Sequence, residues 1–263
     1  MGDRHSVSRI RRASVVLAFA CLLVAPALAH PTNDELAARF AKGSYMEAAR
    51  MAEQAASADD YAFAARSLLA ECMTGDREPD SGMVERAAAD ARRALALDPM
   101  HEEGRLQLAI AISLKSRSMS LMDAWYAGYG EEGRKLAEDV LAQDPGNFYA
   151  HGFLAVWNIE VRRRGGVLGA SLLSASLEAG RKHYAIAAHL APGDAGVHWQ
   201  FARALTALDA VRYGDEAAAI LDRAVAASSP DHVQMVMKTR AAQLAEALKQ
   251  NRKAAQVLAR TLL

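Results

Sequence analysis

The segment from Ala87 to Ala109 reads AAADARRALALDPMHEEGRLQLA, and its spacing recurs elsewhere in the chain. Small residues lie twelve, eight and five positions before Pro99, and a Leu-Ala pair begins nine positions after it. Small or apolar residues occupy the same offsets around Pro145 and Pro192. The segments around Pro99, Pro145 and Pro192 thus agree at all four of these offsets. We therefore interpret the pattern as an internal repeat, which is typical of stacked architectures.

The spacing predicts pairs of helices joined by a turn. Residues three and four positions apart lie on one face of a helix, and small side chains there let a neighbouring helix approach closely. Each proline then ends a helix, because it lacks a backbone donor and disfavours helical geometry in the residue before it. Such a unit cannot bury its apolar face alone and must stack on its copies. The positions concerned are Ala87, Ala91, Ala94 and Leu108-Ala109, then Gly133, Ala137, Val140 and Leu154-Ala155, then Gly180, Tyr184, Ala187 and Phe201-Ala202.

These residues resemble the tetratricopeptide repeat (TPR) family, most clearly over residues 87–202. The resemblance implies an all-α fold, a right-handed superhelical solenoid of about six TPR-like helical hairpins. The prolines, however, are 46 and 47 residues apart, against about 34 for the family. The surplus falls between Ala109 and Gly133 and between Ala155 and Gly180. We therefore expect two of the hairpins to have lengthened helices.

Residues 1–29 have the features of a secretory signal peptide. Four arginines precede an apolar run from Ala13 to Val24, and Ala27-Leu28-Ala29 forms a cleavage site with small residues at its outer positions. We expect a mature TPR-like helical repeat domain at residues 30–263, located in the bacterial periplasm. The apolar run is too short to span a bilayer as a mature helix, so no membrane span is expected after removal of the signal.

The composition argues against several classes of partner. Lys plus Arg and Asp plus Glu each number 31, so the chain has no general attraction for nucleic acid or for an anionic membrane. Cys21 lies in the signal peptide, which leaves Cys72 without a partner for an intrachain disulfide. Cys72 lies in a helical apolar run and is interpreted as a buried small hydrophobe, with a reactive or pairing thiol as the alternative.

The sequence contains no familiar catalytic or cofactor-binding motif. A Walker loop, a dinucleotide-binding glycine pattern, His-Glu-x-x-His and Gly-x-Ser-x-Gly are all missing. We therefore expect no enzyme activity, no catalytic residue and no cofactor. His151 and His198 share a repeat position that would bring their side chains together, but no carboxylate or thiol cluster accompanies them, so no metal is expected. Cleavage would make His30 the N-terminal residue, and this position is the only feature that suggests copper binding by His30.

Two inserted segments, residues 113–130 and 158–171, carry candidate binding residues. In a regular solenoid both lie on one edge of the stack. The simpler interpretation is a pair of lengthened helices with a solvated basic turn. The other is a recognition edge, with arginines for an anion and aromatic rings for an apolar or flat group. The candidates in the inserts are Trp125, Tyr126, Arg162, Arg163 and Arg164.

The family resemblance implies a scaffold or adaptor that binds a protein or peptide partner in the bacterial envelope. The alternative is a periplasmic small-molecule-binding component of a tripartite (TRAP-type) transporter. Helical-repeat proteins of that class are similar in having a Gly-Gly-x-x-Gly turn before a repeat helix, as from Gly165 to Gly169 here. An apolar tunnel lined by Trp157 and Trp199 would favour the transporter component, and an open groove would favour the adaptor.

Overall fold

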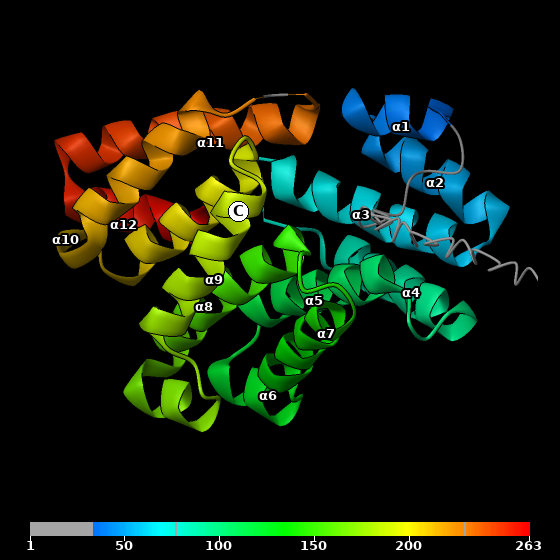
Figure 1. The fold of residues 1–263 in the computed structure, drawn as a ribbon, viewed down its shortest axis with the longest axis horizontal. Coiled ribbons are helices and arrows are strands. Elements are labelled where there is room, and N and C mark those ends of the chain that lie inside the picture. Colours follow the sequence, from blue (N-terminus) through cyan, green and yellow to red (C-terminus); the bar gives the residue numbers. More distant parts are fainter. Residues whose placement is uncertain (1–33, 77, 229) are drawn as a thin grey trace, which may run out of the picture.

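The computed structural model describes residues 34–76, 78–228 and 230–263, and within these ranges the protein is all-helical (Figure 1). The all-α prediction is confirmed for this part of the chain, whereas the predicted signal peptide and His30 lie outside the described residues. None of the described helices has both the length and the apolar character needed to cross a bilayer. The helices are α1 (Asp34–Ala41), α2 (Tyr45–Ala55), α3 (Ala58–Thr74), α4 (Ser81–Leu97), α5 (Glu102–Arg117), α6 (Leu121–Tyr126), α7 (Tyr129–Gln143), α8 (Phe148–Leu172), α9 (Leu177–Leu190), α10 (Ala195–Ala226), α11 (His232–Gln250) and α12 (Arg252–Thr261).

The three prolines of the repeat separate helices, as the sequence predicts. The helices that precede them, α4, α7 and α9, each end two residues ahead of the proline. The helices that follow are capped by side chains, since His101, Asn147 and Asp194 each accept a hydrogen bond from the backbone N–H three positions on. These caps satisfy donors that the first turn of a helix otherwise leaves unpaired.

Small residues at the repeat positions lie at close contacts between helices. Ala109, Ala155 and Ala202 have no exposed surface. A β-carbon added to Gly180 would lie 3.1 Å from the carbonyl oxygen of Ala155 and 3.1 Å from the Ile159 Cδ1 atom. The backbone of α9 therefore packs directly on α8, which is the close approach that the small-residue spacing predicts.

The prediction of two lengthened helices is wrong, because the first insert is divided among α5, α6 and α7 and the second is interrupted within α8. In the first insert, α6 is a separate short helix, and α7 begins after Gly128, whose φ is +70°. In the second, α8 is interrupted at Gly166, which has φ +63° and ψ −155°. Glycine adopts a positive φ without the steric cost that other residues meet there, so Gly128 separates α6 from α7 and Gly166 interrupts α8.

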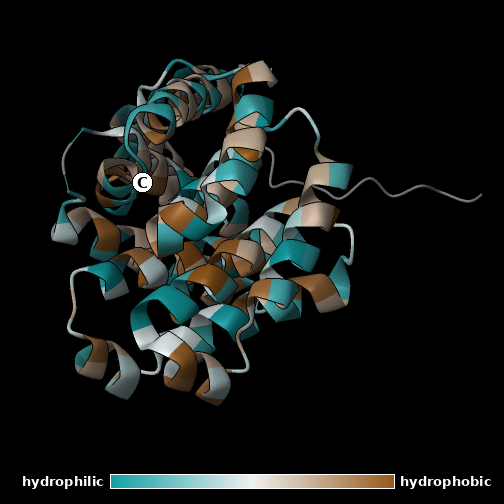
Figure 2. Ribbon diagram, turned by 90° about the vertical axis from the view of Figure 1, so that its left-hand side faces the viewer, coloured by the Kyte–Doolittle hydropathy of each residue, from teal (hydrophilic) through white to brown (hydrophobic). Residues whose placement is uncertain are grey.

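The two inserts lie side by side at one end of the molecule, in the lower part of Figures 1 and 2. Arg164 of α8 donates from Nη1 to the carbonyl oxygen of Ser116 at 2.8 Å, and from Nη2 to that of Met119 at 3.0 Å. These bonds connect α8 to the end of α5. The prediction that both inserts share one edge is therefore confirmed.

The chain closes on itself, because α11 returns to contact α1 and α3 (Figure 1). Arg240 of α11 is nearly buried and donates to backbone carbonyl oxygens where α3 ends. The Tyr45 hydroxyl at the start of α2 lies 3.1 Å from the His232 Nδ1 atom. The helices consequently surround a central space. The carbonyl groups bound by Arg240 belong to Met73, Thr74 and Gly75.

Candidate ligand-binding cavity

The ring of helices lines a partly open cavity of about 620 Å³. Residues of α1, α3, α5, α6, α7, α8, α10 and α11 line it, so elements from both ends of the described chain contribute. Small-molecule sites in proteins typically measure about 300–1,000 Å³. The cavity is therefore large enough to hold a small organic molecule.

Apolar side chains form most of the cavity wall. Burial, and to a smaller degree the Asp194 carboxylate, raises the pKa of the lining phenol Tyr149 to about 12, as expected for a wall poorly accessible to water. An apolar guest gains about 25 cal/mol for each Å² of its surface removed from water. Representative lining residues are Phe40, Phe63, Ile110, Phe153, Val156 and Met237.

Three carboxylates of the wall are already bound by neighbouring groups. Glu103 forms an ion pair with Arg66, with 3.1 Å between the nearest nitrogen and oxygen atoms. Asp194 accepts from the Gln234 side-chain amide at 2.8 Å, in addition to capping α10. Asp231 caps α11 by accepting from the backbone N–H of Gln234 at 2.9 Å. Glu103 is thus paired with a cation, whereas Asp194 and Asp231 accept from neutral N–H groups that stabilise the starts of α10 and α11.

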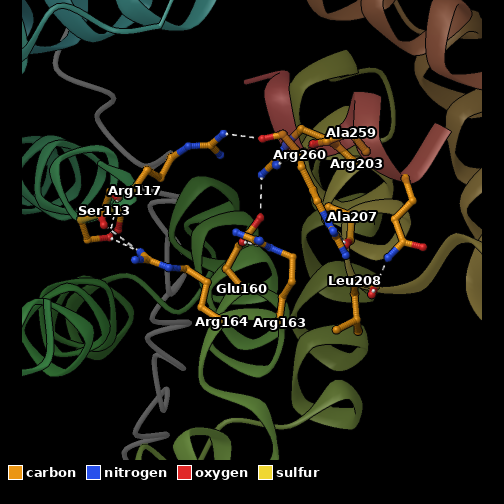
Figure 3. Close-up of polar contacts among 12 residues, drawn as sticks. Ser113, Arg117, Glu160, Arg163, Arg164, Arg203, Ala207, Leu208, Ala259 and Arg260 are labelled. Carbon is orange, nitrogen blue, oxygen red and sulfur yellow. Dashed lines mark hydrogen bonds and ion pairs between the residues drawn. The ribbon is translucent and has the colours of Figure 1, made fainter. Parts of the chain in front are cut away.

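A fourth carboxylate lies within a group of arginines on one side of the cavity (Figure 3). We call Arg117, Arg163, Arg164, Arg203 and Glu160 the basic cluster. Arg163 Nε donates to one Glu160 oxygen at 2.7 Å, and Arg203 Nη2 donates to the other at 3.2 Å. All members except Arg163 line the cavity. The cluster thus sets four guanidinium groups against one carboxylate.

Carbonyl groups at helix ends help to orient the arginines. Arg203 Nη1 donates to the carbonyl oxygen of Ala259 at 3.4 Å, and Arg117 Nη2 donates to that of Arg260 at 3.1 Å, both in the last turn of α12. Arg164 binds the end of α5 in the same way. The C-terminus of a helix carries a partial negative charge, which favours cations but does not neutralise a full positive charge.

The basic cluster carries net positive charge near neutral pH. Burial of Glu160 would by itself raise its pKa, but Arg203, Arg163 and Arg117 outweigh burial and lower the pKa. Burial, followed by repulsion from Arg203, lowers the pKa of Arg117 to about 10. Arg117 therefore remains charged at pH 7, against a wall that is otherwise mostly apolar.

The aromatic residues predicted to bind a partner are found in different environments. Trp125 and Trp157 line the cavity, and Trp157 Nε1 donates to the carbonyl oxygen of Gly130 at 2.9 Å. Trp199 does not line it, because it is fully buried and its Nε1 donates to the carbonyl oxygen of Leu263 at 2.9 Å. Tyr126 is 79% exposed on α6.

The three consecutive arginines contact different neighbours and do not form one surface site. Arg163 binds Glu160, and Arg164 binds the end of α5. Arg162 belongs to neither of these networks among the described residues. The side chains diverge because neighbouring residues of a helix are about 100° apart around its axis. Two of the three join the basic cluster.

The sequence patterns do not indicate Arg117, Glu160 or Arg203 as site residues. One signal is present for Arg203, which stands eleven positions after its repeat proline, where the two preceding repeats have Ile110 and Val156. All three of these equivalent residues line the cavity. An arginine at a position that is otherwise aliphatic indicates a charged feature of the interior, because buried arginine is rare unless it is paired.

The two repeat-equivalent histidines each bind the turn of their own repeat, and not each other. The Nε2 atoms of His151 and His198 lie 3.1 Å from the carbonyl oxygen of the proline that opens each turn. The His151 Nδ1 atom instead lies 2.9 Å from the Nδ1 atom of His183. Across the described ranges, no group of three or more His, Cys, Asp or Glu side chains is placed to hold a metal ion.

Cys72 is buried, as its apolar sequence surroundings predict. It is 5% exposed, and burial raises the pKa of its thiol to about 11. The reactive thiolate form is therefore scarce at neutral pH.

Comparison with known proteins adds no relative to this description. No protein-family model matches the sequence, and no curated protein matches it significantly.

Proposed function

We propose that this protein binds a small amphipathic molecule inside its ring of helices. The observation that carries this proposal is the cavity of about 620 Å³, whose wall is mostly apolar and has one strongly basic side. In this proposal the helices form a right-handed, TPR-like solenoid, residues 1–29 direct its export to the periplasm, and the protein is not an enzyme. This role corresponds to that of the ligand-binding helical-repeat component of a TRAP-type transporter. The turn from Gly165 to Gly169 resembles a turn found in proteins of that class.

The closure of the ring supports a small molecule over an extended peptide. An adaptor of the solenoid type presents an open concave surface along which a peptide or helix lies. Here α11 contacts both α1 and α3, and Arg240 connects α11 to the end of α3. The inner surface is consequently bordered by helices from both ends of the described chain, and a guest of limited length is the better match.

The adaptor function remains the second candidate because of an exposed apolar surface on the two inserts. Contiguous apolar surface of this kind often marks a contact site for another protein. It adjoins the cavity, since Leu121 and Trp125 also line the cavity wall. A protein docked on the inserts would therefore lie next to the cavity. The exposed residues of this surface are Leu121, Met122, Trp125, Tyr126, Val167, Leu168 and Leu172.

A substitution that fills the cavity tests the proposal. Ile110 lines the cavity and is partly buried, so Ile110→Trp places an indole ring in the space that the guest needs. We expect the wild type to bind the neutral fluorophore N-phenyl-1-naphthylamine saturably, and the variant to bind it at least about tenfold more weakly, a loss of about 1.4 kcal/mol. Fluorescence titration measures both affinities.

Val257→Trp is the matched control, because Val257 lies on α12 with 62% of its surface exposed. It adds the same side chain outside the cavity and should bind the fluorophore as the wild type does. Thermal melts establish that both variants are folded. Absence of saturable binding to the wild type, or equal binding by the wild type and Ile110→Trp, would contradict the proposed function.

A further inference from the structure

The charge balance of the basic cluster is incomplete. Glu160 accepts from Arg163 and Arg203, while Arg164 is directed to the carbonyl groups at the end of α5. Glu78 acts on Arg117 as well, but its effect is the weakest of those that determine the Arg117 pKa. Four guanidinium groups around Glu160 therefore leave a surplus of positive charge at the cavity wall.

Among the arginines of the basic cluster that line the cavity, Arg117 has the largest unused capacity to donate hydrogen bonds. A guanidinium group carries five N–H donors. Within the described part of the chain, Arg203 uses Nε, Nη1 and Nη2 for protein acceptors, whereas Arg117 makes one hydrogen bond, to the carbonyl oxygen of Arg260. Arg117 lines the cavity, so its remaining donors are available to a guest.

The position of Arg117 combines burial with repulsion from like charge. Both effects lower its pKa, and Arg203 is the strongest of the neighbouring charges that do so. A bound anion removes this unfavourable interaction. Guanidinium and carboxylate groups match in shape, since two parallel N–H donors bind the two oxygens of one carboxylate.

We propose that Arg117, supported by Arg203 and Arg164, binds the carboxylate head group of an amphiphile whose apolar body fills the cavity. In Figure 3, Arg203 reaches Glu160, whereas Arg117 extends toward Arg260 and Arg164 toward the end of α5. The head group lies against the basic cluster, and the apolar body extends toward the wall that Phe153 and Val156 help to form. This assignment of ligand class rests on the proposed function above.

A pair of ligands that differ in charge tests the assignment. Dodecanoate and dodecanol have the same chain length, and both are measured by displacement of N-phenyl-1-naphthylamine at pH 8. The wild type is expected to bind dodecanoate at least about tenfold more tightly than dodecanol, because bonds with a charged partner are about twice as strong as neutral ones. Equal affinity of the wild type for the two ligands overturns the inference without involving any variant.

Substitutions at Arg117 test whether this residue provides the preference. Arg117→Gln should reduce the ratio of the two affinities to near one, and Arg117→Lys should retain part of it because the charge remains. Arg92→Gln is the control, since Arg92 is exposed on α4 and lies away from the cavity lining; its ratio should equal that of the wild type. A purely structural role for Arg117 predicts a lower melting temperature with an unchanged ratio, and that result overturns the assignment.

The outcomes separate this inference from the function on which it rests. If neither alkyl ligand displaces the fluorophore and the fluorophore itself does not bind, the cavity is not a ligand site and both proposals are wrong. If both ligands bind with no preference for the carboxylate, the proposed function stands and the anion subsite is wrong.

Discussion

The pair formed by His151 and His183 shows how hydrogen bonds fix the positions of protons on neighbouring rings. His151 directs Nε2 at the carbonyl oxygen of Pro145, which requires a proton on Nε2. Its Nδ1 atom then accepts, and the Nδ1 atom of His183 donates across 2.9 Å. The arrangement leaves no room for a proton on His151 Nδ1, because that proton would face the N–H of His183.

This pair predicts a loss of stability in mild acid. Burial, then His151 and to a smaller extent Lys182, lowers the pKa of His183 below its usual value of 6.5. A base whose pKa is lowered by folding stabilises the protein fully above the unfolded value, and this contribution is lost as the pH falls below it. We therefore expect the melting temperature to fall between pH 7 and pH 5, and to fall less in His183→Gln.

His189→Gln is the control for this pH dependence, because His189 lies on the same helix and is exposed. Its melting temperature should follow the wild-type pH dependence. If His183→Gln shows the same loss between the two pH values as the wild type, the pair does not cause it. Melts recorded by circular dichroism at both pH values provide the comparison.

At the scale of the element, the break in α8 depends on the local backbone. Gly166 has φ +63° and ψ −155°, and no neighbouring heavy atom lies within 4 Å of where its β-carbon would be. Backbone conformation is therefore the reason for glycine at this position, not lack of space. The break redirects the chain so that Val167, Leu168 and Leu172 are exposed beside the first insert.

Adjacent glycines should consequently respond in opposite directions to substitution by alanine. Gly166→Ala forces an L-residue into a region that costs about 1–3 kcal/mol, so we expect destabilisation of that size. Gly165 has no left-handed φ, and its added β-carbon would meet its nearest neighbour, the backbone nitrogen of Ala170, at 3.9 Å. Gly165→Ala should be neutral or stabilising by up to about 1 kcal/mol. Urea denaturation measures both; destabilisation of equal size would show that side-chain space, not φ, is decisive.

At the scale of the whole molecule, one side chain connects the two ends of the ring. Arg240 donates to the carbonyl oxygens of Thr74 at 3.1 Å and Gly75 at 2.7 Å, and to that of Leu263 at 3.1 Å. Carbonyl groups that a helix end leaves unpaired are thereby satisfied by a buried cation. This connection helps to hold α11 against α3, two of the helices that line the cavity.

Removing the connection should both destabilise the protein and open the ring. Arg240→Gln leaves several backbone carbonyl groups without their donor, and bonds to a charged group contribute about 1.5–3 kcal/mol each. We expect a loss of about 2–4 kcal/mol in the free energy of unfolding, and a larger radius of gyration by small-angle X-ray scattering. Lys249→Gln on the same helix removes an exposed cation and should change neither quantity appreciably. An unchanged radius of gyration in Arg240→Gln would show that other contacts close the ring.

Much of the local structure follows from the sequence. The helix ends at Pro99, Pro145 and Pro192 follow from the missing donor and the restricted backbone of proline. The close packing of Gly180 against Ala155 follows from helical periodicity, which places residues three and four apart on one face. Of the predicted site residues, Trp125, Trp157 and Arg164 do line the cavity, although the sequence alone does not place them there.

The ring, the cavity and the basic cluster arise only in the tertiary structure. Spacing along the chain determines which face a residue occupies, but not how small rotations between successive helices add up around the molecule. That sum brings α11 back to α1 and α3. It also brings Arg117, Glu160 and Arg203, which come from α5, α8 and α10, to one side of a single cavity. Trp199 lies outside that cavity for the same reason, since the packing of α10 against the end of the described chain directs its indole to Leu263.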